Sequence, residues 1–170
     1  DNENQTTTVS ILQGNKLLRA LDSLKTEGQQ VPAHTAATLD AHEREYYAAM
    51  LVALLLQQAN GLSDTRSRLL TILLSGLQLT DGLAALLPQA QQSDSAALRE
   101  LKRLLEQRNL KHTFVVDALV LTRLDAPFDE AAIELFSELA FFFEIPQADL
   151  AVLADVASII LGIPCARDLP

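Results

Sequence analysis

The sequence contains little of what several protein classes require. It has one cysteine, Cys165, which excludes a fold held together by disulfides. It has no tryptophan and only 5% aromatic residues, and this scarcity argues against a β-sandwich. Six glycines and six prolines in 170 residues are too few for a linker or a disordered chain. Leucine and alanine dominate instead, so we expect a single all-α domain with an aliphatic core.

The charge of the chain is acidic and unevenly distributed. The net charge is −9 at pH 7, which argues against nucleic acid as a partner because nucleic-acid binding needs a basic surface. Residues 61–112 carry five acidic and seven basic residues, net +2, whereas residues 113–170 carry ten acidic and two basic residues, net −8. An acidic surface of this kind attracts cations or a protein with a basic surface.

No segment has the features of a membrane anchor. The longest apolar run, residues 46–56, is eleven residues long and too short to span a bilayer. The first six residues are polar, so no signal peptide is expected. We therefore expect a cytoplasmic protein without a transmembrane segment, and the sequence does not define its oligomeric state.

Apolar residues recur at helical spacing along the whole chain. The pattern predicts helices over residues 10–26, 40–59, 64–77, 83–87, 95–109, 113–124, 129–143 and 147–161, with Thr80 capping the fourth and Pro88 ending it. The single domain would therefore contain a brace helix within 8–27, a first unit over 40–88, a basic connecting helix over 95–109 and a second unit over 111–162. The predicted core consists of leucines: Leu51, Leu54, Leu55, Leu70, Leu73, Leu119, Leu135 and Leu139.

The sequence pattern predicts that the two units are an internal repeat, the alternative being that any two amphipathic leucine- and alanine-rich segments align. Residues 50–56 align with residues 115–121 at an offset of 65, and the same offset aligns Asn60 with Asp125 and Asp64 with Asp129. Each unit contains a wholly apolar helix, a short polar turn, an amphipathic helix and a shorter helix. One unit cannot cover its own apolar helix, so we expect residues 46–87 and 111–154 to pack together about a pseudo-twofold axis.

The polar turns carry a motif that is similar to that of a known family. Residues 124–130, Leu-Asp-Ala-Pro-Phe-Asp-Glu, and the helix that follows them resemble the TerB-like module, which is the all-helical domain of bacterial tellurite-resistance proteins and of DjlA-type co-chaperones. Residues 60–64, Asn-Gly-Leu-Ser-Asp, form a second copy, and the two copies cover about half of the chain. The resemblance implies an all-helical domain in a bacterial stress or defence system. The chain lacks a His-Pro-Asp tripeptide, so it contains no J-domain.

The sequence departs from the family's pattern in both turns. The family's turn is usually Asp-Gly followed by several acidic residues, whereas Asn60 and Ala126 replace the Asp of one copy and the Gly of the other. The first copy also has Arg66 and Arg68 where acidic residues are usual. A cation site implied by the resemblance would therefore lie in the second copy, at Asp125, Asp129 and Glu130.

Motifs of catalysis are missing. The segment that begins with His42 has Tyr46 where a zinc protease needs its second histidine, and the turn at Asp125 lacks the spacing of an EF-hand. Cys165 has no histidine near it in the sequence to act as a base, and there is no glycine-rich phosphate loop. We therefore expect no enzymatic activity.

Several acidic residues are candidates for a binding surface. Asp117 and Asp155 stand within apolar helical segments, where each carboxylate is either paired or solvated, or belongs to a partner site. Glu130, Glu134 and Glu138 recur every four residues and form one stripe, which is either a solvated face or a docking face. The sequence also contains Phe141, Phe142 and Phe143 in succession, so at least one ring should point away from the core.

The favoured interpretation is a non-enzymatic interaction or scaffold module that binds a protein with a basic surface. The interaction residues are predicted to be Asp117, Glu134, Glu138 and Asp155. The alternative is a cation or small-ligand binder that uses the acidic turn of the second unit, and a divalent cation is the only cofactor considered. A cation binder would change its melting temperature with calcium, magnesium or zinc, whereas an interaction module would not.

Overall fold

The computed structural model describes residues 33–163 of the chain, and these residues fold as an all-α domain. The predicted brace helix within residues 8–27 and Cys165 lie outside the described residues. A short 3-10 helix, η1 (Thr35–Thr38), precedes seven α-helices, and no strand occurs within residues 33–163. The α-helices are α3 (Ala41–Leu56), α4 (Asp64–Gly76), α5 (Leu83–Gln91), α6 (Ser95–Arg108), α7 (Lys111–Arg123), α8 (Glu130–Phe142) and α9 (Gln147–Leu161). The predicted all-α class is confirmed.

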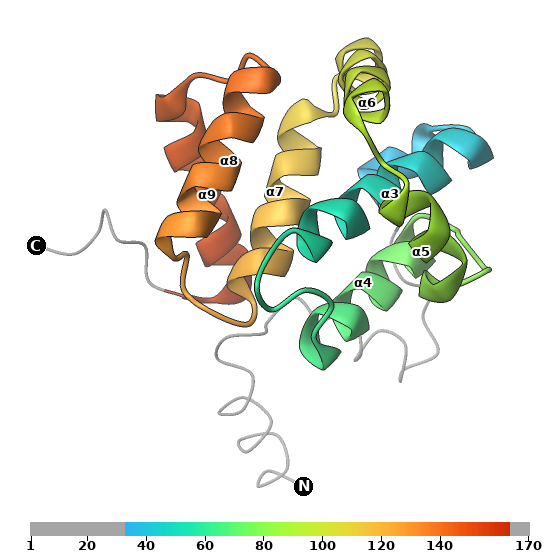
Figure 1. Cartoon of the computed structure of the whole chain (residues 1–170), viewed down its shortest axis with the longest axis horizontal. Coiled ribbons are helices and arrows are strands. Elements are labelled where there is room, and N and C mark those ends of the chain that lie inside the picture. The colour runs from blue at the N-terminus through green and yellow to red at the C-terminus, as the bar shows by residue number, and fades with distance from the viewer. Residues whose placement is uncertain (1–32, 164–170) are drawn as a thin grey trace, which may run out of the picture.

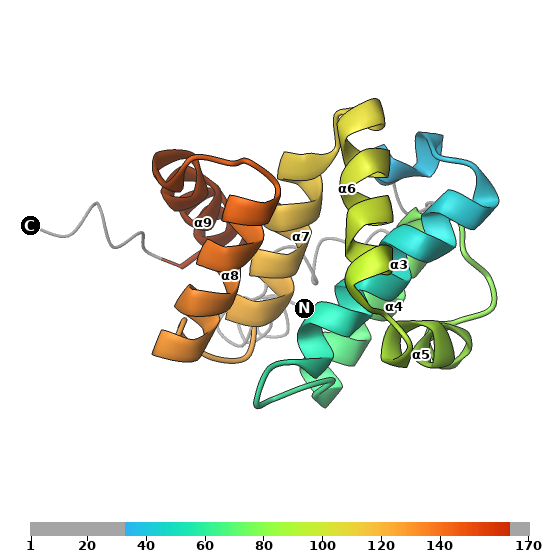
Figure 2. The same ribbon diagram turned by 45° about the horizontal axis from the view of Figure 1, so that its top comes forward.

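Helices α3 and α7 form the centre of the bundle and pack against each other (Figure 1). Helix α5 packs along α3, and α9 packs along α7. The contact between α7 and α9 is the most extensive one between two described helices. Helix α4 contacts both α5 and α7, whereas α8 packs chiefly on α9. Helix α6 contacts both central helices and joins the two halves of the chain (Figure 2).

The core is aliphatic with a short line of aromatic rings. Six of the eight predicted core leucines are buried, and Leu73 and Leu135 are partly buried at its edge. The rings of Tyr47, Phe114 and Phe143 follow one another edge to face, with centroids 5.2 and 5.9 Å apart. Helix α3 from Tyr47 to its end, and α7 from Phe114 to Leu121 apart from Asp117, are apolar on every side, as expected for segments that other helices surround.

Four of the seven described α-helices, α3, α4, α6 and α8, start after a residue whose side chain caps the helix. Asp40 and Glu43 form a capping box at the start of α3. Helix α5, by contrast, begins after Gly82 rather than Thr80 and continues through Pro88 to Gln91, so the predicted end at Pro88 is wrong. Proline removes one backbone hydrogen bond, but the turn beyond it buries Ala90 in the core, and this packing keeps the helix intact.

Helices α4 and α8 are built alike. Each contains 13 residues and begins after a side-chain cap, Ser63 in one and Asp129 in the other. Each is followed by a non-glycine residue in the left-handed conformation, Gln78 and Glu144, both with a φ of 60°. The two helices therefore match at an offset of 66, and the predicted register of 65 is wrong for them by one residue. The sequences of two leucine-rich helices align almost equally well at neighbouring offsets, so the alignment can be one residue out of register. The capping residues mark where each helix begins and therefore define the register. The pseudo-twofold relation of the two units stays a prediction.

Candidate functional site

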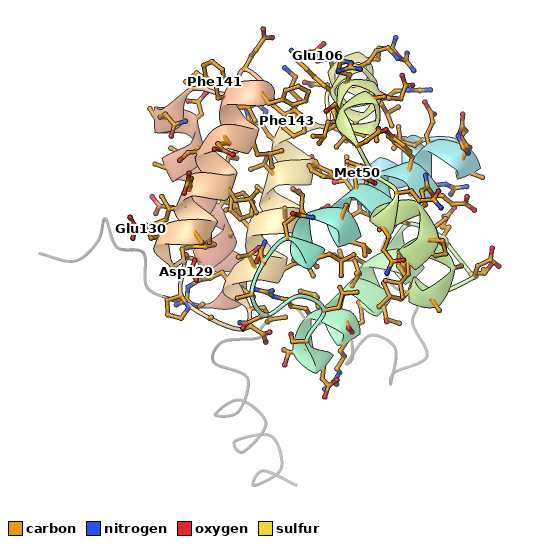
Figure 3. The ribbon with its side chains drawn as sticks, in the orientation of Figure 1. Met50, Glu106, Asp129, Glu130, Phe141 and Phe143 are labelled. Atoms are coloured by element: carbon orange, nitrogen blue, oxygen red, sulfur yellow. The ribbon has the colours of Figure 1, made fainter. Side chains whose placement is uncertain are left out.

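An acidic cleft lies where three helix ends meet. It has a volume of about 320 Å³ and is formed by the end of α3, the end of α7 and the first turns of α8. Figure 3 shows Asp129 and Glu130 at the start of α8, at this end of the molecule. Three carboxylates line the cleft: Asp129, Glu134 and Glu138. The other lining residues are Gln57, Gln58, Ala59, Asn60, Arg66, Thr122, Ala126, Pro127, Ala131, Ala132 and Leu135.

The inner wall of the cleft is held by a buried arginine. Arg66, on α4, is only 2% exposed, and its guanidinium donates hydrogen bonds to three carbonyl oxygens at 3.0–3.1 Å. These acceptors belong to Gly61, Leu121 and Thr122, so the side chain joins α4 to the carbonyl end of α7. Burial lowers the pKa of Arg66, and Asp125, 3.7 Å away, opposes this shift. Arg66 therefore stays charged and fixes the end of α7.

The three residues of the predicted cation site have separate roles. Asp125 pairs with Arg66 and accepts a hydrogen bond from the Ser63 hydroxyl. Asp129 caps α8 by accepting from the Ala132 amide at 2.8 Å. Glu130 is exposed and does not line the cleft. No group of three or more His, Cys, Asp or Glu side chains in residues 33–163 is placed to hold a metal ion, so the structure does not bring these carboxylates together as a ligand set.

The acidic stripe of α8 divides into two parts. Glu130, Glu134 and Glu138 are all exposed, as the four-residue spacing predicts. Glu134 and Glu138 line the cleft, together with Ala131 and Leu135 from the same helix, whereas Glu130 lies beyond its edge. The stripe therefore provides two carboxylates to the wall of the cleft, and the third, Glu130, does not line it.

The opposite wall contains an unsatisfied hydrogen-bond acceptor. Gln58 lines the cleft, and its Nε2 donates to the Thr122 hydroxyl at 2.8 Å. Its Oε1 is buried and accepts no hydrogen bond from the residues that the structure describes. A buried acceptor without a donor is costly and uncommon, and because this atom is buried it is not accessible from the cleft.

An apolar groove continues from the cleft along α3. It has a volume of about 570 Å³ and lies between α3, the loop between α5 and α6, and Leu135 of α8. Gln57 and Leu135 line both the cleft and the groove, so the two are contiguous. The apolar side chains of the groove are Met50, Ala53, Leu54, Leu56, Ala90, Leu98 and Leu135.

Asp117, which the sequence suggested as an interaction residue, is used inside the fold. Its Oδ2 accepts from the Tyr47 hydroxyl at 2.6 Å and from His34 Nε2 at 2.7 Å. His34 Nδ1 accepts from the Ala36 amide, so Nε2 carries the ring proton that points to Asp117. Burial, and then the charge of Asp117, raise the pKa of Tyr47 well above its ordinary value. The cluster joins η1 to α3 and α7.

The remaining interaction candidate and the phenylalanine run have different environments. Asp155 is partly buried on α9 and does not line the cleft. Phe143 is fully buried, whereas Phe141 is 84% exposed, so the expectation that one of the three rings leaves the core is confirmed.

Two polar residues of the site were missed in the sequence. Gln58 gave no signal, because its role depends on the position of α7. Arg66 did give one, since it stands three, four and seven residues before Leu69, Leu70 and Leu73 and so shares their helix face. A charged residue on the apolar face of an amphipathic helix indicates a buried, paired group.

No protein-family model matches the chain, and comparisons with curated proteins and with solved structures likewise give no match. Within residues 33–163, none of the helices combines the length and the hydropathy needed to cross a bilayer.

Proposed function

We propose that the protein is a non-enzymatic interaction module that binds a partner with a basic surface through the acidic cleft and the exposed face of α8. The observation that carries this proposal is the convergence of Asp129, Glu134 and Glu138 on one cleft. Among residues 33–163, Arg66 is the single positive side chain in its wall, and it is already neutralised by Asp125 and bonded to three carbonyl oxygens. The field in the cleft is therefore negative and favours a cationic group.

The contiguous apolar groove supports a protein partner over a free ion. An ion would need only the carboxylates, whereas a protein segment could place basic side chains in the cleft and apolar side chains along α3. The net charge of −8 in residues 113–170 would add long-range attraction to the local contacts. The resemblance of residues 124–130 to the TerB-like turn supports a place in a bacterial stress or defence system, and we propose a cytoplasmic location.

A charge-matched pair of variants tests the proposal. One variant replaces Glu130, Glu134 and Glu138 with glutamine, and the control changes the same number of charges in the first unit by Glu45→Gln, Asp64→Asn and Asp81→Asn. The immobilised wild type and both variants are used to capture proteins from the native host, and the captured proteins are quantified by mass spectrometry. We expect a protein with a basic surface to be captured by the wild type and the control, and about five- to tenfold less of it by the α8 variant after a short incubation at low salt, because the loss of charge slows association.

Salt concentration provides the second part of the test. Exposed charges are screened over about 10 Å at 0.1 M salt, so the difference between the variants should shrink when the salt is raised from about 0.05 M to about 0.5 M. If every captured protein binds the α8 variant as well as the wild type at low salt, the proposed surface is only solvated.

A further inference from the structure

Helix α9 has an apolar outer face, formed by Val152, Val156 and Ile159. These residues stand at positions i, i+4 and i+7 of the helix and are 48%, 37% and 65% exposed. On the opposite side of α9, Ala157 and Leu161 are buried in the core. The helix packs on α7 and, less extensively, on α8, and it lies at the outer edge of the bundle (Figure 2). Helix α9 is therefore apolar on two opposite sides, while the described residues cover only one of them, and a helix of this kind is expected to be buried.

The chain contains a segment with a matching pattern. Residues 10–26, which lie outside the described residues, are predicted from the sequence to form an amphipathic helix. Its leucine face consists of Leu17, Leu21 and Leu24, which have the same i, i+4 and i+7 spacing as the outer face of α9. A single amphipathic helix is marginal in water and gains its stability by packing its apolar face on another surface. The segment therefore needs a surface of the kind that α9 provides.

The charges of the two surfaces are opposite. Residues 10–26 carry three basic residues and one acidic residue, net +2. Residues 130–161, which contain α8 and α9, carry six acidic residues and no basic residue, net −6. On α9, Asp149 and Asp155 stand three residues before and three residues after Val152, so they flank the outer face on both sides. A basic helix that packs on the outer face would thus lie between carboxylates.

The fold places the start of the described chain on a neighbour of α9. His34 Nε2 donates to Asp117 of α7 at 2.7 Å, and the His34 amide donates to the Gly76 carbonyl at 2.9 Å. These bonds fix residue 34 beside α7, and α9 packs along the same helix. Residues 27–33 connect this point to the leucine-rich segment, and seven residues can span about 23 Å. Two successive interhelical distances come to about 20 Å, so the outer face of α9 is within reach.

We propose that residues 10–26 dock as a helix on the outer face of α9 of the same chain, with the leucine face against it. The segment of the same chain is favoured over a second copy, because a short connection gives it an effective concentration on the order of millimolar. The docked helix would extend the core beyond α9 and cover the exposed apolar side chains. This inference is independent of the proposed function, because none of the residues of α9 lines the acidic cleft.

Cysteine cross-linking in the full chain tests the contact. Cys165 is replaced by serine and Val156 by cysteine, and one residue of the leucine face at a time is replaced by a second cysteine. We expect at least one of the three pairs to form an intramolecular disulfide, on mild oxidation, about tenfold faster than the control, because only docking holds the two Cβ atoms close together. The control combines Val156→Cys with Arg19→Cys, which lies on the opposite side of the predicted helix.

Peptide mapping without reduction and the mass of the intact product identify each disulfide. Equal rates for the control and for all three pairs overturn the proposal, since they indicate random encounters of a tethered segment. Disulfides that join two chains in preference also overturn it, and they indicate that a second copy covers the outer face.

The exposure of the outer face provides a second measurement that needs no cross-link. Methyl NMR of the full chain is recorded with a soluble gadolinium chelate, which relaxes methyl groups that are open to water. In the variant Leu17→Ser with Leu21→Ser, we expect the methyl relaxation of the outer face to rise about threefold, because the lost contact returns its surface to water. The matched control, Asn15→Ala with Ser23→Ala on the polar side of the segment, should behave as the wild type. Outer-face methyls that relax in the wild type as fast as that of the exposed Ala84, or that do not respond to the leucine variant, overturn the proposal.

Discussion

Arg66→Met tests how the inner wall of the cleft is held together. Methionine replaces the aliphatic part of the arginine side chain but removes the charge and every donor. The change leaves three carbonyl oxygens, those of Gly61, Leu121 and Thr122, without the guanidinium that they now bind at 3.0–3.1 Å. It also leaves Asp125 without its cationic neighbour. We expect unfolding to become easier without a change of fold.

The magnitude follows from burial and distance. Removing one member of a buried charged network typically costs 3–5 kcal/mol, and Arg66 is 2% exposed. The ion pair accounts for the smaller share, because the separation from Asp125 is 3.7 Å and the Asp125 side chain keeps 14% of its surface in water. We therefore expect a loss of about 4 kcal/mol for Arg66→Met and only about 1 kcal/mol for Asp125→Asn.

Urea unfolding at pH 7, followed by far-UV circular dichroism, measures both variants. In the double variant the two losses should add to less than their sum, because the asparagine at position 125 carries no charge and so does not need the guanidinium of Arg66. A loss below about 1 kcal/mol for Arg66→Met would refute the reasoning, since it would mean that water satisfies the three carbonyls. A loss for Asp125→Asn equal to that of Arg66→Met would show that the ion pair, and not the carbonyl bonds, dominates.

Three further predictions concern single positions. Tyr47→Phe should lower the free energy of unfolding by about 1–2 kcal/mol, because it removes the hydroxyl that donates to Asp117. Since the pKa of Tyr47 is raised in the folded state, the unfolded chain loses the hydroxyl proton at a lower pH than the folded chain. The stability of the wild type should therefore fall more steeply above pH 10 than that of the variant, as thermal melting at several pH values would show. Gly82→Ala should lower stability by about 1–3 kcal/mol, because a φ of 82° with a ψ of 176° is a backbone conformation that only glycine adopts easily. The cost comes from the backbone alone, since no atom lies within 4 Å of an added Cβ. An unchanged melting temperature would contradict this prediction. Phe141→Ser should stay within about 0.5 kcal/mol of the wild type while Phe143→Ala costs about 3–5 kcal/mol, since the first ring is 84% exposed and the second is fully buried; urea unfolding of both variants compares the two positions.

The helices could be predicted because the residues that start and end them act locally. Asp129 caps α8 and Gly162 ends α9, and both act through residues within one turn of the helix end. The continuation of α5 past Pro88 could not be predicted in the same way, because it depends on the burial of Ala90 against other helices. Local signals therefore identify most helix starts, whereas tertiary packing carries α5 past Pro88; the predicted end of the second helix at residue 59 is also wrong, because α3 ends at Leu56.

The candidate site could be predicted only in part. The exposure of Glu130, Glu134 and Glu138 follows from their spacing alone. That Glu134 and Glu138 face the end of α3, while Asp125 turns inward to Arg66, depends on how α3, α7 and α8 meet. The role of Asp117 likewise needs His34 and Tyr47, which are 83 and 70 residues away in the sequence. Contacts over such separations leave no periodic pattern.

The unequal anchoring of α4 and α8 has a consequence for the motions of the domain. Helix α4 is fastened by Arg66 and packs on both α5 and α7, whereas α8 packs chiefly on α9. Local opening requires less free energy where fewer contacts must break, so the amides of α8 should exchange with solvent deuterium sooner than those of α4. The acidic face therefore lies on α8, which is held less firmly than α4 although the two helices are equal in length. A partner that spans α8 and the end of α3 would slow this exchange and join the two halves of the bundle across the cleft.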